Sequence, residues 1–111
     1  MTEREGCALL KERFEAAGLA IAVDVPFAEE GLSLRLDGFD AARRVGFEYI
    51  TTAAGDRAEL GPGVVAALEA RMERGDLYLL LVDELDAADA ALLGRAADGF
   101  LARLRQLGRL P

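Results

Sequence analysis

The sequence contains no histidine and no tryptophan, and Cys7 is its only cysteine. Histidine is the commonest general base and a frequent zinc ligand, so its absence excludes a histidine-based catalytic triad and a histidine zinc site within this chain. A single cysteine cannot form an internal disulfide, which fits a reducing compartment. These absences remove several common kinds of enzyme site before any pattern is considered.

Long apolar segments are also missing. The longest apolar run covers residues 77–82, and it is far shorter than the roughly 20 helical residues that cross a bilayer. The N-terminal residues carry charges of both signs, and no apolar secretory core follows them. We therefore expect a cytoplasmic protein without a membrane partner.

The charge balance is strongly acidic. The formal net charge is −7, from 20 acidic and 13 basic residues. Such a surface repels the phosphate backbone on average, so it does not favour a nucleic acid as partner. With 111 residues, of which 52% are hydrophobic, the chain can bury a core of its own. We predict one domain that covers residues 1–111.

Periodic patterns predict three helices and four strands. Apolar side chains recur every three or four residues in the expected helices and alternate in the first strands. The helices are expected at residues 2–17, 62–74 and 86–107, and the strands at 19–25, 32–37, 45–50 and 77–82. Short loops make the first three strands antiparallel, and the next helix and strand are typical of a right-handed parallel crossover. The prediction is an α+β fold in the order α-β-β-β-α-β-α, with helices packed against a mixed four-stranded sheet.

Four details of this prediction depend on single residues or runs. Pro26 is expected to end the first strand, with a hairpin loop at residues 26–31. The continuous apolar run of the fourth strand indicates a central position in the sheet, covered on both faces. Asp86 is the expected N-cap of the last helix, with Asp89 in its first turn. A loop is expected at residues 51–63.

Two acidic residues are candidates for chemistry. Asp37 ends the expected second strand and Glu48 lies in the middle of the third, and both point to the face opposite the leucine row of residues 32–36. Carboxylates on neighbouring strands can hold Mg²⁺. The metal can then activate a water for phosphodiester cleavage. Asp37 and Glu48 are therefore the catalytic and metal-binding candidates of this hypothesis.

The element order and this Asp-then-Glu placement resemble the PD-(D/E)XK nuclease family. That family has an αβββαβ core, an acidic residue on the second strand and a Glu-X-Lys on the third. The resemblance implies a Mg²⁺ site at Asp37 and Glu48, with Glu12 or Glu15 of the first helix as a further ligand. Ile50 stands at the position of the family's lysine, which implies a degenerate, inactive member that serves as a binding or structural domain.

A plainer interpretation explains the same residues without chemistry. Asp37 and Asp40 flank a turn, where aspartate is favoured because its side chain accepts hydrogen bonds from local backbone amides. Glu48 is then a polar residue on a half-exposed strand. Cys7 lies on the apolar face of the first helix and is expected to be a structural thiol.

A second acidic group follows the fourth strand. Helix capping explains Asp86 and Asp89 in this group, although it could also bind a cation or a basic partner. The group consists of Asp83, Glu84, Asp86 and Asp89.

Our leading hypothesis is a non-enzymatic protein-interaction or structural domain without a cofactor, which binds a protein partner or a second copy of itself. Apolar side chains in expected loops and ends motivate it, since they could form an interface. They are Phe27, Phe39, Val64 and Leu110. The alternatives are the nuclease-like protein with Mg²⁺ and an acidic protein similar in outline to type III secretion chaperones. The chaperone resemblance rests on size, charge and element order alone, and that fold has a fifth strand that we do not find.

Overall fold

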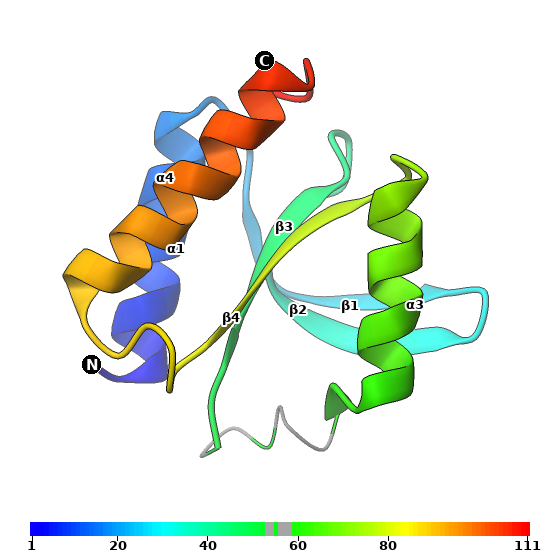
Figure 1. Cartoon of the computed structure of the whole chain (residues 1–111), viewed down its shortest axis with the longest axis horizontal. Helices are drawn as coiled ribbons and strands as arrows, with labels where there is room; N and C mark the ends of the chain where they lie inside the picture. The colour runs from blue at the N-terminus through cyan, green and yellow to red at the C-terminus, as the bar shows by residue number, and fades with distance from the viewer. Residues whose placement is uncertain (53–54, 56–58) are drawn as a thin grey trace.

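A computed structural model describes residues 1–52, 55 and 59–111. The described residues form the predicted α+β fold, with the elements in the predicted order (Figure 1). The helices are α1 (Glu3–Ala16), α3 (Pro62–Glu73) and α4 (Ala90–Gln106), and the strands are β1 (Ala22–Glu29), β2 (Leu32–Asp40), β3 (Val45–Ile50) and β4 (Tyr78–Asp83). The expected loop at residues 51–63 lies partly outside the described residues, and its last two residues belong to α3.

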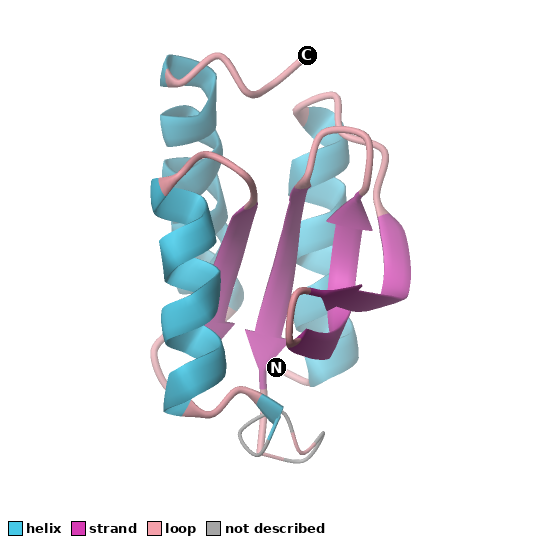
Figure 2. Cartoon of the chain, turned by 90° about the vertical axis from the view of Figure 1, so that its right-hand side faces the viewer, coloured by secondary structure: helices cyan, strands magenta, loops and turns pink. Residues whose placement is uncertain are grey.

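The four strands form one mixed sheet in the order β1-β2-β3-β4. β1 with β2 and β2 with β3 are antiparallel, and β3 with β4 is parallel. Helices α1 and α4 cover one face and α3 covers the other, which gives three layers (Figure 2). None of the described helices is long and apolar enough to span a membrane.

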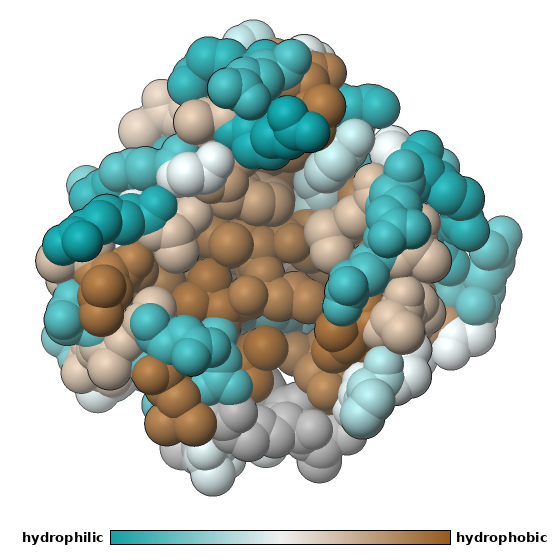
Figure 3. Space-filling view, viewed as in Figure 1, coloured by the Kyte–Doolittle hydropathy of each residue, from teal (hydrophilic) through white to brown (hydrophobic). Residues whose placement is uncertain are grey.

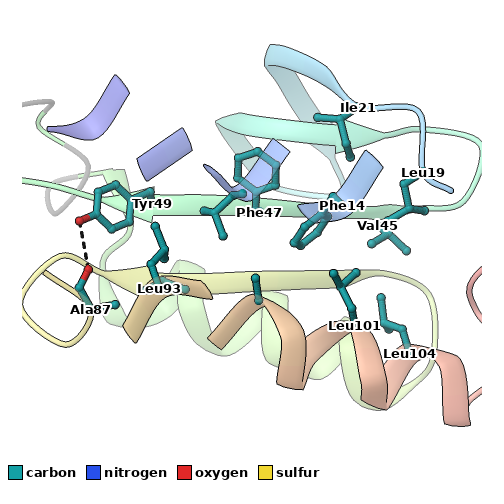
Figure 4. Close-up of a cluster of buried hydrophobic side chains, with 13 residues drawn as sticks. Phe14, Leu19, Ile21, Val45, Phe47, Tyr49, Ala87, Leu93, Leu101 and Leu104 are labelled. Atoms are coloured by element: carbon teal, nitrogen blue, oxygen red, sulfur yellow. Dashed lines mark hydrogen bonds between the residues drawn. The ribbon is translucent and has the colours of Figure 1, made fainter. Parts of the chain in front are cut away.

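The core is divided by the sheet into two parts. The part beneath α1 and α4 contains the alternating residues Val45, Phe47 and Tyr49 of β3, as their spacing predicted (Figure 4). The Phe14 ring meets the Phe47 ring edge-on at 5.1 Å, and the Tyr49 hydroxyl donates to the Ala87 carbonyl over 3.2 Å. The second part, beneath α3, contains the leucines of β2 with Leu68, Leu77 and Leu79.

Three predicted strand bounds are wrong. β1 begins at Ala22 and not at Leu19. β1 continues through Pro26 to Glu29, so the hairpin turn contains only Glu30 and Gly31. β1 is an edge strand, and an edge strand tolerates proline where its missing N–H would face away from the sheet. β2 likewise continues past Asp37 to Asp40.

β4 is an edge strand of the sheet in the described part of the chain, and the prediction of a central position is wrong. Both of its faces are apolar because α4 packs on one and α3 on the other. A continuous apolar run therefore indicates that both faces of the strand are covered. It does not indicate that both edges of the strand are paired.

Two further expectations are corrected at the surface. Asp89, not Asp86, is the N-cap of α4, and its carboxylate accepts a hydrogen bond from the Leu92 N–H over 2.9 Å. Phe27 and Phe39 are each only 5% exposed, because β1 and β2 extend far enough to place both rings in the core beneath α3. Val64 and Leu110 are partly buried against the two cores, so these four residues do not form an exposed interface.

Candidate functional site

Asp37 and Glu48 lie where β2 and β3 separate. The ladder between these strands contains three residue pairs and ends at Gly38 with Phe47. At the next position the Asp37 N–H donates to Glu48 Oε1 over 2.6 Å, and the Tyr49 N–H donates to Asp37 Oδ2 over 2.8 Å. Each carboxylate therefore accepts a bond from the opposite strand in place of a backbone carbonyl, and the two predicted residues meet at one point of the sheet.

Burial makes this arrangement costly unless it is hydrogen-bonded. Glu48 is 2% exposed, and a buried carboxylate must recover in hydrogen bonds what it loses in hydration. Among the described residues, no buried side-chain nitrogen or oxygen lacks a partner. The Glu48 carboxylate is thus part of the interior, and it is not the half-exposed surface group that the plainer interpretation expected.

Helix α1 adds Glu3 and Cys7 to this point. Their ligand atoms and that of Asp37 all lie within 4.8 Å of one another. The helix is fixed here by a capping box, in which the Thr2 hydroxyl accepts from the Glu5 N–H and the Glu5 carboxylate accepts from the Thr2 N–H. Glu3 and Cys7 are one helical turn apart, so both project toward the sheet.

The environment of Cys7 keeps its sulfur protonated. Burial first, and then the nearby carboxylates of Asp37 and Glu3, raise the pKa of the Cys7 thiol. Only the thiolate is a strong nucleophile or metal ligand. Cys7 is therefore a structural thiol, and the Glu3 and Asp37 carboxylates both lie next to its sulfur.

The cluster opens into a pocket of about 570 Å³ between α1 and β1. Pockets that bind small molecules have volumes of this order. The lining includes two cations, Arg4 and Lys11, although the Lys11 ammonium also pairs with Glu15 at 3.2 Å. The pocket is lined by Glu3, Arg4, Cys7, Ala8, Lys11, Val23, Asp24 and Asp37.

The helix residue expected to join the site is the wrong one. Glu12 is exposed and does not line the pocket, and Glu15 lies on the surface with Lys11. Glu3 takes the expected place, because it precedes Cys7 by four residues on the face that meets the sheet. That spacing is visible in the sequence and could have identified Glu3. Ile50 packs against the core beneath α3.

A second candidate surface lies at the open edge of β4. The view onto this edge shows a hollow with hydrophobic side chains at its centre, bounded by α4 on one side and α3 on the other (Figure 3). Leu80 and Leu81 of β4 are only partly buried. The apolar surface is therefore in a groove along a strand edge and not in the loops where we expected it.

The acidic group after β4 has local structural roles. Asp83 Oδ1 accepts from the Leu85 N–H and Glu84 Oε1 accepts from the Thr52 N–H, each over 2.9 Å. With Asp89 as the helix cap, these bonds account for three of the four acidic residues.

No family model, curated protein or solved structure matches this chain. The resemblance to the PD-(D/E)XK family therefore rests on the element order and on Asp37 and Glu48.

Proposed function

We propose that this chain is a non-enzymatic protein-interaction domain. The observation that carries the proposal is the edge of β4 at the floor of an apolar groove, with which no other strand of the described residues pairs. Proteins usually protect such an edge with charges, proline or a covering segment, because it can pair with another chain. An apolar groove at an unprotected edge is a typical protein-binding surface.

The carboxylate site is consistent with a domain that does not catalyse. Ile50 replaces the lysine that would help to activate water, and no histidine is present to act as a base. Asp37 and Glu48 have a structural purpose, since they join β2 to β3 where the backbone ladder ends. Their presence is explained without a reaction.

Two measurements test the proposal. Light scattering after size exclusion, at several concentrations, reports self-association. Selection from a displayed random-peptide library, followed by calorimetry on the isolated peptides, reports partner binding. We expect selected peptides with micromolar or tighter affinity, or a concentration-dependent dimer. A strict monomer that selects no peptide would overturn the proposal.

A metal-dependent, nuclease-like activity is the second candidate function. The Glu3 and Asp37 carboxylates, which meet beside a pocket and next to the Glu48 side chain, favour it, because oxygen ligands suit Mg²⁺ and Mn²⁺. Asp37 and Glu48 would hold the ion, and Lys11 in the pocket lining would supply the cation that Ile50 cannot.

Titration with Mg²⁺ and Mn²⁺, followed by NMR of the side-chain carboxyls, tests this candidate. Metal binding should perturb Asp37 and Glu48 and should be lost in Asp37→Asn, while the exposed Glu12→Gln serves as the matched control. Unchanged carboxyl signals at millimolar metal, with no cleavage of single- or double-stranded DNA, would rule it out. The secretion-chaperone alternative has no specific observation in its favour.

A further inference from the structure

The backbone of β4 offers hydrogen-bonding groups at its open edge. The Tyr78 N–H donates to the Arg44 carbonyl over 3.0 Å, on the side of β3. Backbone groups alternate in direction along a strand that pairs on one side. The N–H and C=O groups of Leu79 and Leu81 therefore point away from β3, toward the groove, whereas the Asp83 carbonyl accepts from the Asp86 and Ala87 N–H groups.

One of these outward groups has only a weak acceptor. The Leu79 N–H donates to the thioether sulfur of Met72 over 3.4 Å. Thioether sulfur is a poor acceptor compared with a carbonyl oxygen, and the long, unbranched methionine side chain can move aside at low cost. The carbonyl of an added strand would replace this bond with a stronger one.

The two helices present apolar walls to whatever lies on β4. Asp98 on α4 bonds Arg13 of α1, so the opposite side of α4 faces the open edge of the sheet. On α3, Met72 marks the side that faces β4. By helical spacing the walls are formed by Leu92 and Ala96 on α4 and by Val65 and Met72 on α3, while the Phe100 ring stacks on Phe14 of α1.

The same helices exclude a second copy of this chain at this edge. Figures 1 and 2 show α3 and α4 extending beyond β4 on its open side, one on each face of the sheet. Two paired strands lie about 4.8 Å apart, whereas packed helices need about 8–10 Å between their axes. A paired β4 of a second copy would bring its own helices into collision with these, so the groove fits a strand without flanking helices.

Charge at the two ends of the groove gives the polarity of that strand. Asp86 lies at the end where β4 finishes and is exposed, next to Asp83 and Glu84, whose carboxylates accept local backbone hydrogen bonds. At the other end the Arg109 guanidinium lies 5.3 Å from the centre of the Tyr78 ring. A segment with a basic end and an acidic end complements these charges.

We propose that β4 accepts, as a fifth strand, an extended apolar segment of a protein partner with lysine or arginine at the end beside Asp86 and an acidic residue beside Arg109. This inference rests on the proposed interaction function and names the class of partner. Backbone bonds to Leu79 and Leu81 would provide affinity, and the two apolar walls would select valine, isoleucine or leucine on both faces of the segment.

Synthetic peptides test the proposal directly. Each has a central valine and leucine run that matches the length of β4, with two lysines at one end and two glutamates at the other, in both chain directions. Binding is measured by fluorescence anisotropy. One direction should bind, and Asp86→Lys should weaken it by about tenfold, which corresponds to one charge-assisted contact.

A pair of variants separates strand addition from simple apolar contact. Leu81→Pro removes the outward N–H without a loss to the β3 ladder, and Leu81→Ala removes the side chain but keeps the N–H. We expect Leu81→Pro to bind about tenfold more weakly than Leu81→Ala. Circular dichroism checks that both variants fold. If the proline variant does not fold, peptides N-methylated at alternate residues test the wild-type protein, since methylation of the pairing edge alone should abolish binding.

The outcomes distinguish this inference from the function on which it rests. Equal binding by Leu81→Pro and Leu81→Ala, or equal effects of both methylation patterns, would overturn strand addition. Library-selected peptides that bind wild type and Leu81→Pro equally well would support the interaction function but place the binding site at another surface. If the protein is a strict monomer, the library yields no binder and the designed peptides do not bind, both proposals are wrong.

Discussion

Gly46 is the position at which one added methyl group should be most damaging to the sheet. A Cβ on this residue would lie 2.3 Å from the Gly38 carbonyl oxygen and 2.8 Å from a ring carbon of Phe39. Gly46 pairs with Phe39 in the short β2–β3 ladder, so the backbone oxygen can recede only if the strands separate. Overpacking of a core costs about 1–3 kcal/mol, and a clash with backbone belongs at the upper end of that range.

We therefore expect Gly46→Ala to lower the free energy of unfolding by about 2–3 kcal/mol. For a domain of this size that loss lowers the midpoint temperature by about 8–20 °C. Urea denaturation followed by circular dichroism measures the change, and an unchanged m-value shows that the unfolded state is unaffected.

The matched control is the same substitution at Gly99. Gly99 lies inside α4, and a Cβ there meets no atom within 4 Å. Alanine in a helix interior is favoured over glycine by about 0.5–1 kcal/mol, so Gly99→Ala should stabilise the domain by that amount. A Gly46→Ala variant as stable as the wild type would refute the close approach of β2 and β3, whatever the control shows.

Three further predictions concern charged and reactive groups. A hydrogen bond from the Arg44 guanidinium is the main cause that lowers the pKa of Glu29 to about 2. The ionised Glu29 carboxylate should therefore contribute its full stabilisation above the ordinary pKa of 4.5 and lose it as the pH falls toward 2. Glu29→Gln should make the free energy of unfolding less dependent on pH in this range. Because the pKa of Cys7 is raised, its alkylation by iodoacetamide at about pH 8 should be much slower in the native protein than in urea; equal rates would contradict the burial of the thiol. Glu48 and Glu59 each accept a β2 backbone N–H over 2.6 Å, the first buried and the second exposed; Glu48→Ala should cost about 1–3 kcal/mol and Glu59→Ala well under 1, since water can replace only the second, and equal losses in denaturation would be the contrary result.

The fold class could be predicted because each element carries its own periodic pattern. Alternation in residues 45–50 and the three-four spacing of Cys7, Leu10 and Phe14 report burial on one side of an element, and burial is what the core requires. Helix α3 begins at Pro62 as expected, because proline at the first helical position loses no hydrogen bond.

The errors arose where one local signal has two physical causes. Pro26 was taken as a strand end, but an edge strand accepts proline when no ladder bond uses its nitrogen. Asp86 and Asp89 are both good N-caps. The choice between them depends on where the buried side chains of α4, which begin at Leu93, pack against the sheet.

The approach of Asp37 and Glu48 was predicted, but the face of Glu48 and the residue that α1 contributes were not. Val45, Phe47 and Tyr49 pack on the face opposite the leucines of β2, so Glu48 alternates onto the leucine face and not away from it. The approach of Asp37 and Glu48 requires only that two neighbouring strands be antiparallel and joined by a short turn. The place of Glu3 depends on how α1 crosses the sheet, and Cys7 fixes that crossing by packing against the core. Tertiary packing of this kind leaves little trace in residue type.

The two candidate surfaces meet at one register pair of the sheet, Glu48 of β3 with Leu81 of β4. The pocket beside Asp37 lies between α1, β1 and β2, while the groove lies at the far edge of the sheet on β4. Asp37 is on β2, two strands away from β4, so Asp37→Asn should leave peptide binding unchanged. Coupling between the pocket and the groove would require β3 to transmit a change, and its residues Val45, Phe47 and Tyr49 are fully buried in a packed core that resists small displacements.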